Sequence, residues 1–264
     1  MANVTFYYQG VDGATIMQNS VGEDASHGII NLYDRNKNLY WKAANANTAG
    51  YLNINMGSQV DVNSLVLVNH NYTVVTPNGI GIKLASDNND DGNYSAVTYS
   101  IGNSGSYHKC ETGNLINWLE IFTLVQSKRY WRLYLEAMGA ATYQQIGFIL
   151  LGAKFQHSVN WNFGDGQRGY DFGIETGETI GGHRRRQLNY YMRRSWEYTF
   201  EYIDETHRSN LEAFLASVYS SFYPFFFTDE ESSGYYVCLT NKNTDLTHLN
   251  YQEYNFRLRL EEEL

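Results

Sequence analysis

The sequence predicts a mainly β protein, and composition and residue alternation are the observations that predict it. The chain has 264 residues, among them 23 Tyr, 13 Phe and 5 Trp, but only 2 Pro. Aromatic and β-branched side chains fit the pleated surface of a strand. Alternating apolar and polar residues mark a strand with one buried face. We therefore expect many short strands, joined by turns that contain Gly and Asn.

The clearest alternation lies near the C-terminus. Aromatic residues occupy every second position from 196 to 202, and apolar residues every second position from 254 to 260. Between these segments, Asp204 is a suitable N-cap for a helix. Apolar residues then recur at helical spacing, which predicts one helix at about residues 205–221. The C-terminal part is therefore expected to be a β-sandwich with one packed α-helix.

Residues 1–155 are expected to form a succession of strands separated by turns. The clear segments are Tyr51–Met56, Ser64–Val68, Gly81–Ala85, Arg129–Leu135 and Gln145–Gly152. Spacing of this kind is typical of a β-sandwich. The expected inward-facing residues are Trp41, Leu65, Leu67, Trp131, Leu133 and Leu135. Residues 114–126 fit either a helix or a strand followed by a loop, and the sequence leaves this choice open.

A boundary near residues 154–160 divides the chain into domains at residues 1–155 and 156–264. A chain of this length can bury two hydrophobic cores. Residues 161–182 follow the boundary and are rich in Gly, so they form either short strands or one long loop. Long loops in compact proteins usually serve binding or assembly. We expect this segment to take part in assembly.

The charge of the chain excludes some partners. Its net charge is −9, which argues against non-specific binding to nucleic acid, since such binding needs clustered Lys and Arg. No apolar run approaches the length needed to span a membrane, so no membrane insertion is expected. The N-terminus lacks the pattern of an export signal, and we expect synthesis in a cytoplasm.

An arginine cluster stands out from this acidic composition. Its members are Arg184, Arg185, Arg186, Arg193 and Arg194. Contact with nucleic acid is one interpretation, but we favour a subunit interface or a solvated loop. In a subunit interface the cluster would meet acidic loops of a neighbouring copy. The polar faces of the two C-terminal strands carry Glu197, Glu201, Arg257 and Arg259. If these strands pair, the four side chains form a charged ladder that fixes the register and faces a neighbouring subunit.

The first half resembles the discoidin family (coagulation factor type C, galactose-binding-like). The segments that carry the resemblance are Asn31–Asp34, Trp41–Ala43, Tyr51–Gly57, Val60–Asn71, Lys83–Asp87, Gly92–Tyr94, Arg129–Leu133 and Ile146–Gly152. The resemblance implies a jelly-roll β-sandwich, with loops at one end that in relatives bind sugars, lipid head groups or other proteins.

Three consecutive residues are candidates for such a ligand-binding site. His70 and Asn71 offer planar polar groups, and Tyr72 places an aromatic ring beside them. This combination is typical of a sugar-contacting cluster. The alternative interpretation is a histidine at the end of a strand, in an ordinary turn.

No metal site is expected. Asp87, Asn89, Asp91 and Gly92 match the start of a calcium loop, but Thr98 stands where the loop needs a bidentate Glu. A polar hairpin turn accounts better for this segment. Some relatives hold a structural calcium where this chain has Asp34. The neighbouring Arg35 and Lys37 make a cation unfavourable there. We also expect no cofactor.

The second half resembles the minor tail proteins of long-tailed bacteriophages and prophages. The matching segments are Gly181–Arg186, Arg193–Phe200, Tyr219–Phe222, Tyr223–Phe227 and Tyr254–Glu262. The resemblance implies a small β-sandwich with one helix, which forms rings by joining the sheets of adjacent subunits. Distal tail proteins usually carry the ring domain first. Here the accessory-like domain comes first, which leaves the position along a tail open.

The chain shows no pattern of an enzyme. It has no Gly-x-Ser-x-Gly, no His-Glu-x-x-His, no phosphate-binding loop and no Cys–His spacing for nucleophilic catalysis. The two resemblances imply a virion structural protein of a tailed phage or phage-like particle, assembled in the host cytoplasm. Its partners would be other copies of itself and other tail proteins. The alternative is a carbohydrate-binding adhesion module that recognises host surface glycans.

Overall fold

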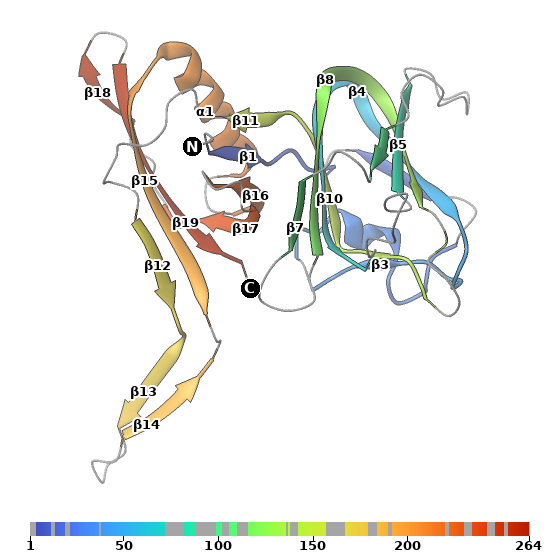
Figure 1. The fold of residues 1–264 in the computed structure, drawn as a ribbon, viewed down its shortest axis with the longest axis horizontal. Coiled ribbons are helices and arrows are strands. Elements are labelled where there is room, and N and C mark those ends of the chain that lie inside the picture. Colours follow the sequence, from blue (N-terminus) through green and yellow to red (C-terminus); the bar gives the residue numbers. More distant parts are fainter. Residues whose placement is uncertain are drawn as a thin grey trace. The chain divides into compact units, whose positions relative to one another are not determined.

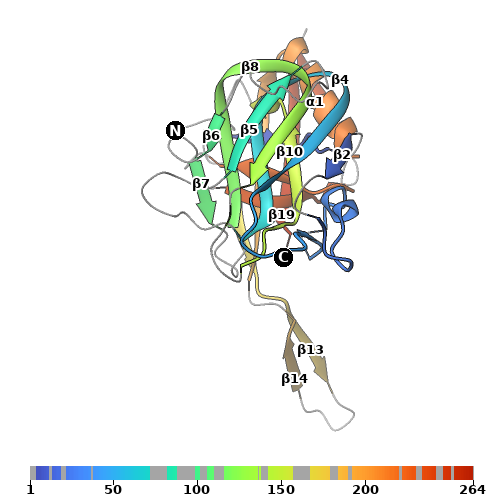
Figure 2. The same ribbon diagram turned by 90° about the vertical axis from the view of Figure 1, so that its right-hand side faces the viewer.

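The fold is described from a computed structural model (Figures 1 and 2). The structure describes residues 4–11, 14–18, 22–36, 38–71, 82–87, 99–101, 106–109, 116–135, 137, 142–156, 167–178, 184–189, 192–219, 222–229, 234–241, 246–250 and 253–263. The chain divides into two compact units. The first unit is Tyr7–Lys154, and the second joins Met1–Phe6 to Phe155–Leu264. The protein is mainly β, as the sequence predicts.

In the described part of the first unit, most strands belong to one sheet of order β10-β4-β8-β5-β6, with β2 beside β4 and β7 beside β8. The short strands β3 and β9 form a separate pair. The bounds are β2 Thr15–Gln18, β3 Trp41–Lys42, β4 Gly50–His70, β5 Ile82–Asp87, β6 Tyr99–Ile101, β7 Ser106–Lys109, β8 Ile116–Leu135, β9 Gln145–Ile146 and β10 Phe148–Gly152. A 3₁₀-helix, η1, covers Ile29–Leu32. Residues 116–126 of the segment that fits helix or strand therefore lie in β8, and residues 114 and 115 lie outside the described residues.

The long strands β4 and β8 build both layers of a β-sandwich. The first part of β4 pairs with β2, and its last part pairs with β10. Its pairing with β8 is interrupted between Asn55 and Val60 and again between Val62 and Ser64. Such irregularities bend a strand and increase its twist. Gly57 lies in the first interruption with φ 78°, a value that favours glycine. The single sheet thus folds over onto itself.

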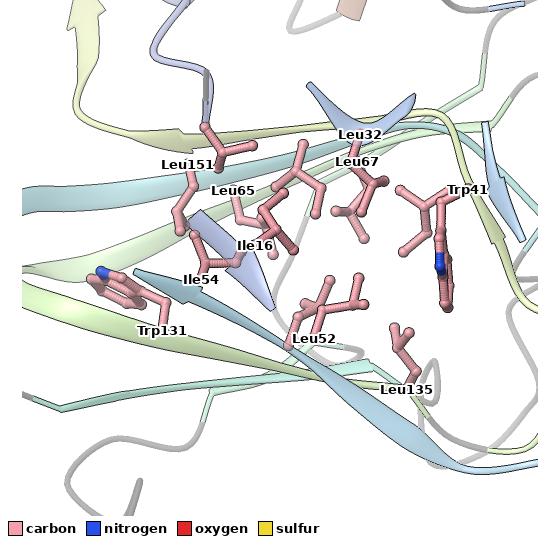
Figure 3. Close-up of a cluster of buried hydrophobic side chains, with 14 of the residues drawn as sticks. Ile16, Leu32, Trp41, Leu52, Ile54, Leu65, Leu67, Trp131, Leu135 and Leu151 are labelled. Atoms are coloured by element: carbon pink, nitrogen blue, oxygen red, sulfur yellow. The ribbon is translucent and has the colours of Figure 1, made fainter. Parts of the chain in front are cut away.

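The core of the first unit fills the space between these two layers (Figure 3). Residues of one face of β4 and β8 point into it, as the alternation predicts. The buried set includes Leu52, Ile54, Leu65, Leu67, Trp131, Leu133, Leu135, Ile149 and Leu151. All six inward-facing residues predicted from the sequence are buried, Trp41 among them. Burial of each such side chain contributes roughly 1.5–3 kcal/mol.

Most described strands of the second unit form one sheet of order β11-β1-β16-β17-β19-β15-β12, with β18 beside β19, and two further strands form a separate pair. The bounds are β1 Thr5–Tyr7, β11 Lys154–Gln156, β12 Gln167–Asp171, β15 Arg193–Ile203, β16 Phe225–Thr228, β17 Gly234–Leu239, β18 Leu246–Asn250 and β19 Glu253–Glu262. The predicted C-terminal pairing is present, since β15 runs antiparallel to β19.

Helix α1 spans Glu205–Ser217. The predicted N-cap is confirmed, because Asp204 Oδ1 accepts a hydrogen bond of 2.7 Å from the backbone N–H of His207. The helix ends earlier than the predicted residue 221. Val218 is its C-cap, and Tyr219 has φ 47°, so the chain turns away before Phe222.

The core of the second unit is a cluster of phenylalanines between α1 and the sheet. The ring centroids of Phe6 and Phe214 are 5.1 Å apart, and those of Phe214 and Phe225 are also 5.1 Å apart. Phe155 stacks on Phe214 at 5.9 Å. Phe6 lies in β1, so the first strand of the chain completes the second unit. The predicted boundary near residue 155 places this strand in the first half instead.

The Gly-rich segment after the boundary contains strands. Its described part holds β12 and β13 (Ile174–Glu178), and β13 pairs with β14 (Arg184–Leu188). We call residues 167–178 and 184–189 the arm. Figures 1 and 2 show β13 and β14 as a two-stranded ribbon that continues beyond the sheet of the second unit. Every residue of these two strands is exposed.

We expect Phe6→Ala to destabilise the second unit by about 3–5 kcal/mol, because it removes a ring from the phenylalanine cluster. Hydrogen exchange resolved by mass spectrometry would show the loss in peptides from α1 and β16. Phe222→Ala is the matched control. Phe222 is 73% exposed, so its loss should change the free energy of unfolding by no more than about 0.5 kcal/mol. Equal losses in the two variants would contradict the assignment of β1.

Candidate functional site

The candidate site is a row of polar and aromatic side chains on the first unit. We call its five members, Asp24, His27, Tyr40, Lys42 and Tyr143, the rim. Lys42 Nζ lies 4.4 Å from the centroid of the Tyr143 ring and 3.6 Å from Asp24 Oδ2. Asp24 Oδ1 is 2.9 Å from His27 Nδ1. The His27 ring stacks on Tyr40 with 4.4 Å between centroids. The rim is thus a continuous chain of contacts with an aromatic ring at each end.

The short strand β3 positions the rim. Trp41 points into the core and is fully buried, so its neighbour Lys42 points outward. The backbone N–H of Lys42 donates to His27 O, and Lys42 O accepts from the N–H of Asp24, both at 3.0 Å. These bonds place Asp24 and His27 beside the Lys42 side chain.

Asn71 holds the segment that carries Tyr143. Its side-chain Nδ2 donates to Tyr143 O at 2.6 Å, and its Oδ1 accepts from the backbone N–H of Gln145 at 2.9 Å. The Tyr143 side chain is 40% exposed. Asn71 therefore fixes the backbone of the segment, and Tyr143 presents its ring to solvent.

Asp24 is held in its ionised form. The hydrogen bond from His27 and the 3.0 Å bond from the backbone N–H of Ser26 lower the pKa of its carboxyl below the ordinary value. The carboxylate accepts hydrogen bonds only, whereas the Lys42 ammonium donates only. The rim therefore offers an acceptor, a donor and aromatic rings on one exposed surface.

The predicted ligand residues lie elsewhere or have another role. His70 is 2% exposed, so its ring is not at the surface where the prediction placed it. Burial lowers its pKa from 6.5 to about 4, which keeps the imidazole neutral at neutral pH. Asn71 is a positioning residue for Tyr143, and Tyr72 lies outside the described residues. Sequence reasoning missed the rim, whose only signal was the outward position of Lys42 next to a buried Trp.

The predicted charged ladder on the second unit is largely satisfied within the chain. Glu197 contacts both Arg257 and Arg259, and Arg259 Nε donates to Glu197 Oε2 at 2.8 Å. Glu201 lies in the irregularity between Phe200 and Ile203, so it is not part of the regular ladder. The ladder joins β15 to β19, and its role at a subunit interface stays a prediction.

The predicted arginine cluster separates into two groups. Arg193 donates to Glu261 Oε1 at 2.8 Å, and Arg194 lies 3.3 Å from Glu262 Oε1 in a buried pair. These two therefore belong to the packing of the second unit, and their role at a subunit interface stays a prediction. Arg184, Arg185 and Arg186 form most of β14 and are exposed.

The described residues contain no group of three or more His, Cys, Asp or Glu side chains that could hold a metal ion. Asp34 Oδ1 accepts the backbone N–H of Asn36 at 2.9 Å, as in a polar turn. Most of the segment that resembles a calcium loop, residues 88–98, lies outside the described part of the chain. No described helix is long and apolar enough to cross a membrane.

Known structures similar to this chain are carbohydrate-binding modules. A chitosan-binding module of a chitosanase/glucanase from Paenibacillus sp. IK-5 matches with a TM-score of 0.42 and 15% identity, over 55% of this chain and 100% of that one. The family 32 module CBM32-1 of a Clostridium perfringens family 31 glycoside hydrolase matches with a TM-score of 0.38 and 12% identity, over 56% of this chain and 99% of that one. The family 32 module of NanJ from the same organism, solved with galactose, matches with a TM-score of 0.37 and 15% identity, over 56% of this chain and 98% of that one.

At these scores and identities the likeness carries no argument about what this chain binds. No family model and no curated protein sequence matches the chain. The comparisons also give no support to the resemblance between the second half and phage tail proteins, which stays a prediction.

The burial of His70 predicts a pH dependence of stability. The unfolded chain binds a proton at His70 near pH 6.5, but the folded chain binds it only near pH 4. Stability therefore falls as the pH drops from 6.5 to 4. At about 1.4 kcal/mol per pKa unit, the loss is about 3 kcal/mol. His70→Gln should lack this contribution. Urea unfolding of both proteins across this range measures the difference, and parallel curves would contradict the prediction.

Proposed function

We propose that this chain is a non-catalytic binding protein whose first unit recognises a carbohydrate at the rim. The observation that carries the proposal is the exposed Tyr143 ring beside the paired Lys42 and Asp24. A sugar ring has an apolar C–H face and a surrounding belt of hydroxyl groups. An aromatic ring fits the face, while a fixed donor and acceptor fit the hydroxyls.

The rigidity of the rim supports this proposal. Tyr143 is held through Asn71, and Lys42 is held through its backbone bonds to Asp24 and His27. Side chains that are already fixed lose little conformational entropy when a ligand binds. A hydroxyl-rich ligand can therefore be bound with moderate affinity on an open surface.

A second function is favoured by the arm. We propose that the second unit joins copies of the chain into a larger assembly, such as a ring in the tail of a phage or phage-like particle. Two-stranded ribbons are marginally stable in water, and the strands of this one are exposed throughout. A partner that covers the arm would bury its exposed strands and stabilise the ribbon. The two functions are compatible, with one unit for binding and the other for assembly.

We expect Tyr143→Ala and Asp24→Asn each to weaken binding to a glycan identified on an array by about tenfold or more, because each removes one of the groups that fit a sugar. Isothermal titration calorimetry with the full chain would measure the loss. Tyr170→Ala is the matched control, since Tyr170 is 59% exposed but lies in the second unit. The proposal fails if the wild type binds no glycan on the array or if Tyr143→Ala binds as well as the wild type.

The assembly function has a separate test. Sedimentation velocity of the wild-type chain over a series of concentrations should show species larger than the monomer. Quantitative mass spectrometry of purified particles should then give several copies per particle. A chain that stays monomeric and occurs in no particle would contradict this proposal and leave the carbohydrate proposal untouched.

A further inference from the structure

The second unit carries two exposed apolar surfaces with different charge. The first is on the arm. Its large exposed side chains are Tyr170 at 59%, Phe172 at 51%, Ile174 at 58% and Leu188 at 50%. Leu188 is paired with Ile174, so both strands of the ribbon contribute. Arg184 and Arg186 lie on the same face of β14 as Leu188, whereas Arg185 lies on the other face, and Glu178 of β13 pairs with Arg184. Beyond its apolar base, this face therefore carries two arginines and one glutamate.

The second surface follows helix α1. Tyr202 precedes the helix, and Tyr219 and Phe222 follow it; these side chains are 59%, 70% and 73% exposed. Glu205 and Glu212 lie between them on the helix, with 49% and 53% of their side chains exposed, and both form an ion pair with Arg208. Two carboxylates and one guanidinium leave this surface with a net negative charge between its aromatic ends.

Both tyrosines of the helix surface have left-handed backbone conformations. Tyr202 has φ 60° and Tyr219 has φ 47°. Such conformations are unfavourable for residues other than glycine, and they are retained where the surrounding structure enforces them. Tyr219 and Phe222 are further fixed by ring contacts with Tyr223, at 5.4 and 4.8 Å between centroids. The aromatic residues after the helix are thus a fixed feature of the surface.

The arm and α1 of one copy cannot reach each other. Asp171, in the arm, pairs with the first residue of β15, and α1 begins just after the last. Tyr170 pairs with Arg194, and Tyr202 lies eight residues further along β15, so about 27 Å of strand separates the two surfaces. Figure 1 shows them at opposite ends of β15. A contact between them therefore joins two copies head to tail, which produces a closed ring or a filament.

We propose that the arm of one copy docks on the α1 surface of the next copy. The arm's apolar base would contact the exposed aromatic residues, and its arginines would face Glu205 and Glu212. Complementary charge of this kind fixes register and selects the partner. The proposal rests on the assembly function and names the two surfaces that carry it.

Photo-crosslinking tests the contact directly. A photo-crosslinking phenylalanine analogue replaces Phe172 in the full chain, which is mixed with an isotopically labelled wild-type copy. The expected crosslinks join the two copies and map to residues 202–222. If the mixture forms oligomers but the crosslinks map to other segments, the docking proposal is overturned while the assembly function stands. If the wild type forms no oligomer at all, both are overturned.

Charge reversal gives a second test. R184E/R185E/R186E should weaken self-association by about tenfold or more, because like charges would then face each other. Mixing this variant with E205K/E212K should restore association relative to either variant alone. E175K/E178K is the matched control: it changes exposed charges on β13 of the same arm in the opposite direction, so association should be retained. A mixture that associates no better than its separate components would overturn the proposal.

Discussion

The pairing of β4 with β8 is the constraint on which the first unit depends. Both strands are long enough to enter both layers, and the irregularities in β4 let the sheet fold over its own apolar face. The inward residues of the two strands then meet across one core. The same core buries Trp41, and the alternation of the short strand β3 sends Lys42 to the surface. The position of the rim is therefore a consequence of how the core is closed.

Much of the fold was predictable because alternation reports burial directly. The strands that carry the cores, the position of Trp131 and Leu133, and the helix N-cap at Asp204 all follow from local patterns. Three features could not be predicted from the sequence, and each has its own physical reason. β1 has three residues, too few to show a period or a partner. The bends of β4 lie in a polar stretch whose composition is typical of a turn between two strands. The arm has no buried face, so alternation does not apply to it.

The candidate site was less predictable than the fold. His70 was selected because its planar polar group stands beside Asn71 and Tyr72, but the ring is buried. Asn69 has φ 51°, and the register with β8 shifts between Leu67 and His70, so the alternation earlier in the strand does not predict where this ring lies. The rim assembles from residues near positions 24–27, 40–42 and 143, which are brought together by the backbone bonds of Lys42, the pairing of β3 with β9 and the side chain of Asn71. Contacts between such distant segments depend on tertiary structure, and one sequence contains no local signal for them.

The ion pairs of the second unit explain why its arginines differ in role. Glu197, Glu261 and Glu262 engage the arginines of β15 and β19, so these charges hold the sheet and are partly shielded from a partner. The arginines of β14 lie beyond the reach of that sheet, on a ribbon with no core of its own. Surface ion pairs contribute little to stability, about 0–1 kcal/mol each. Three adjacent exposed arginines on a marginal ribbon therefore add little to the stability of the fold.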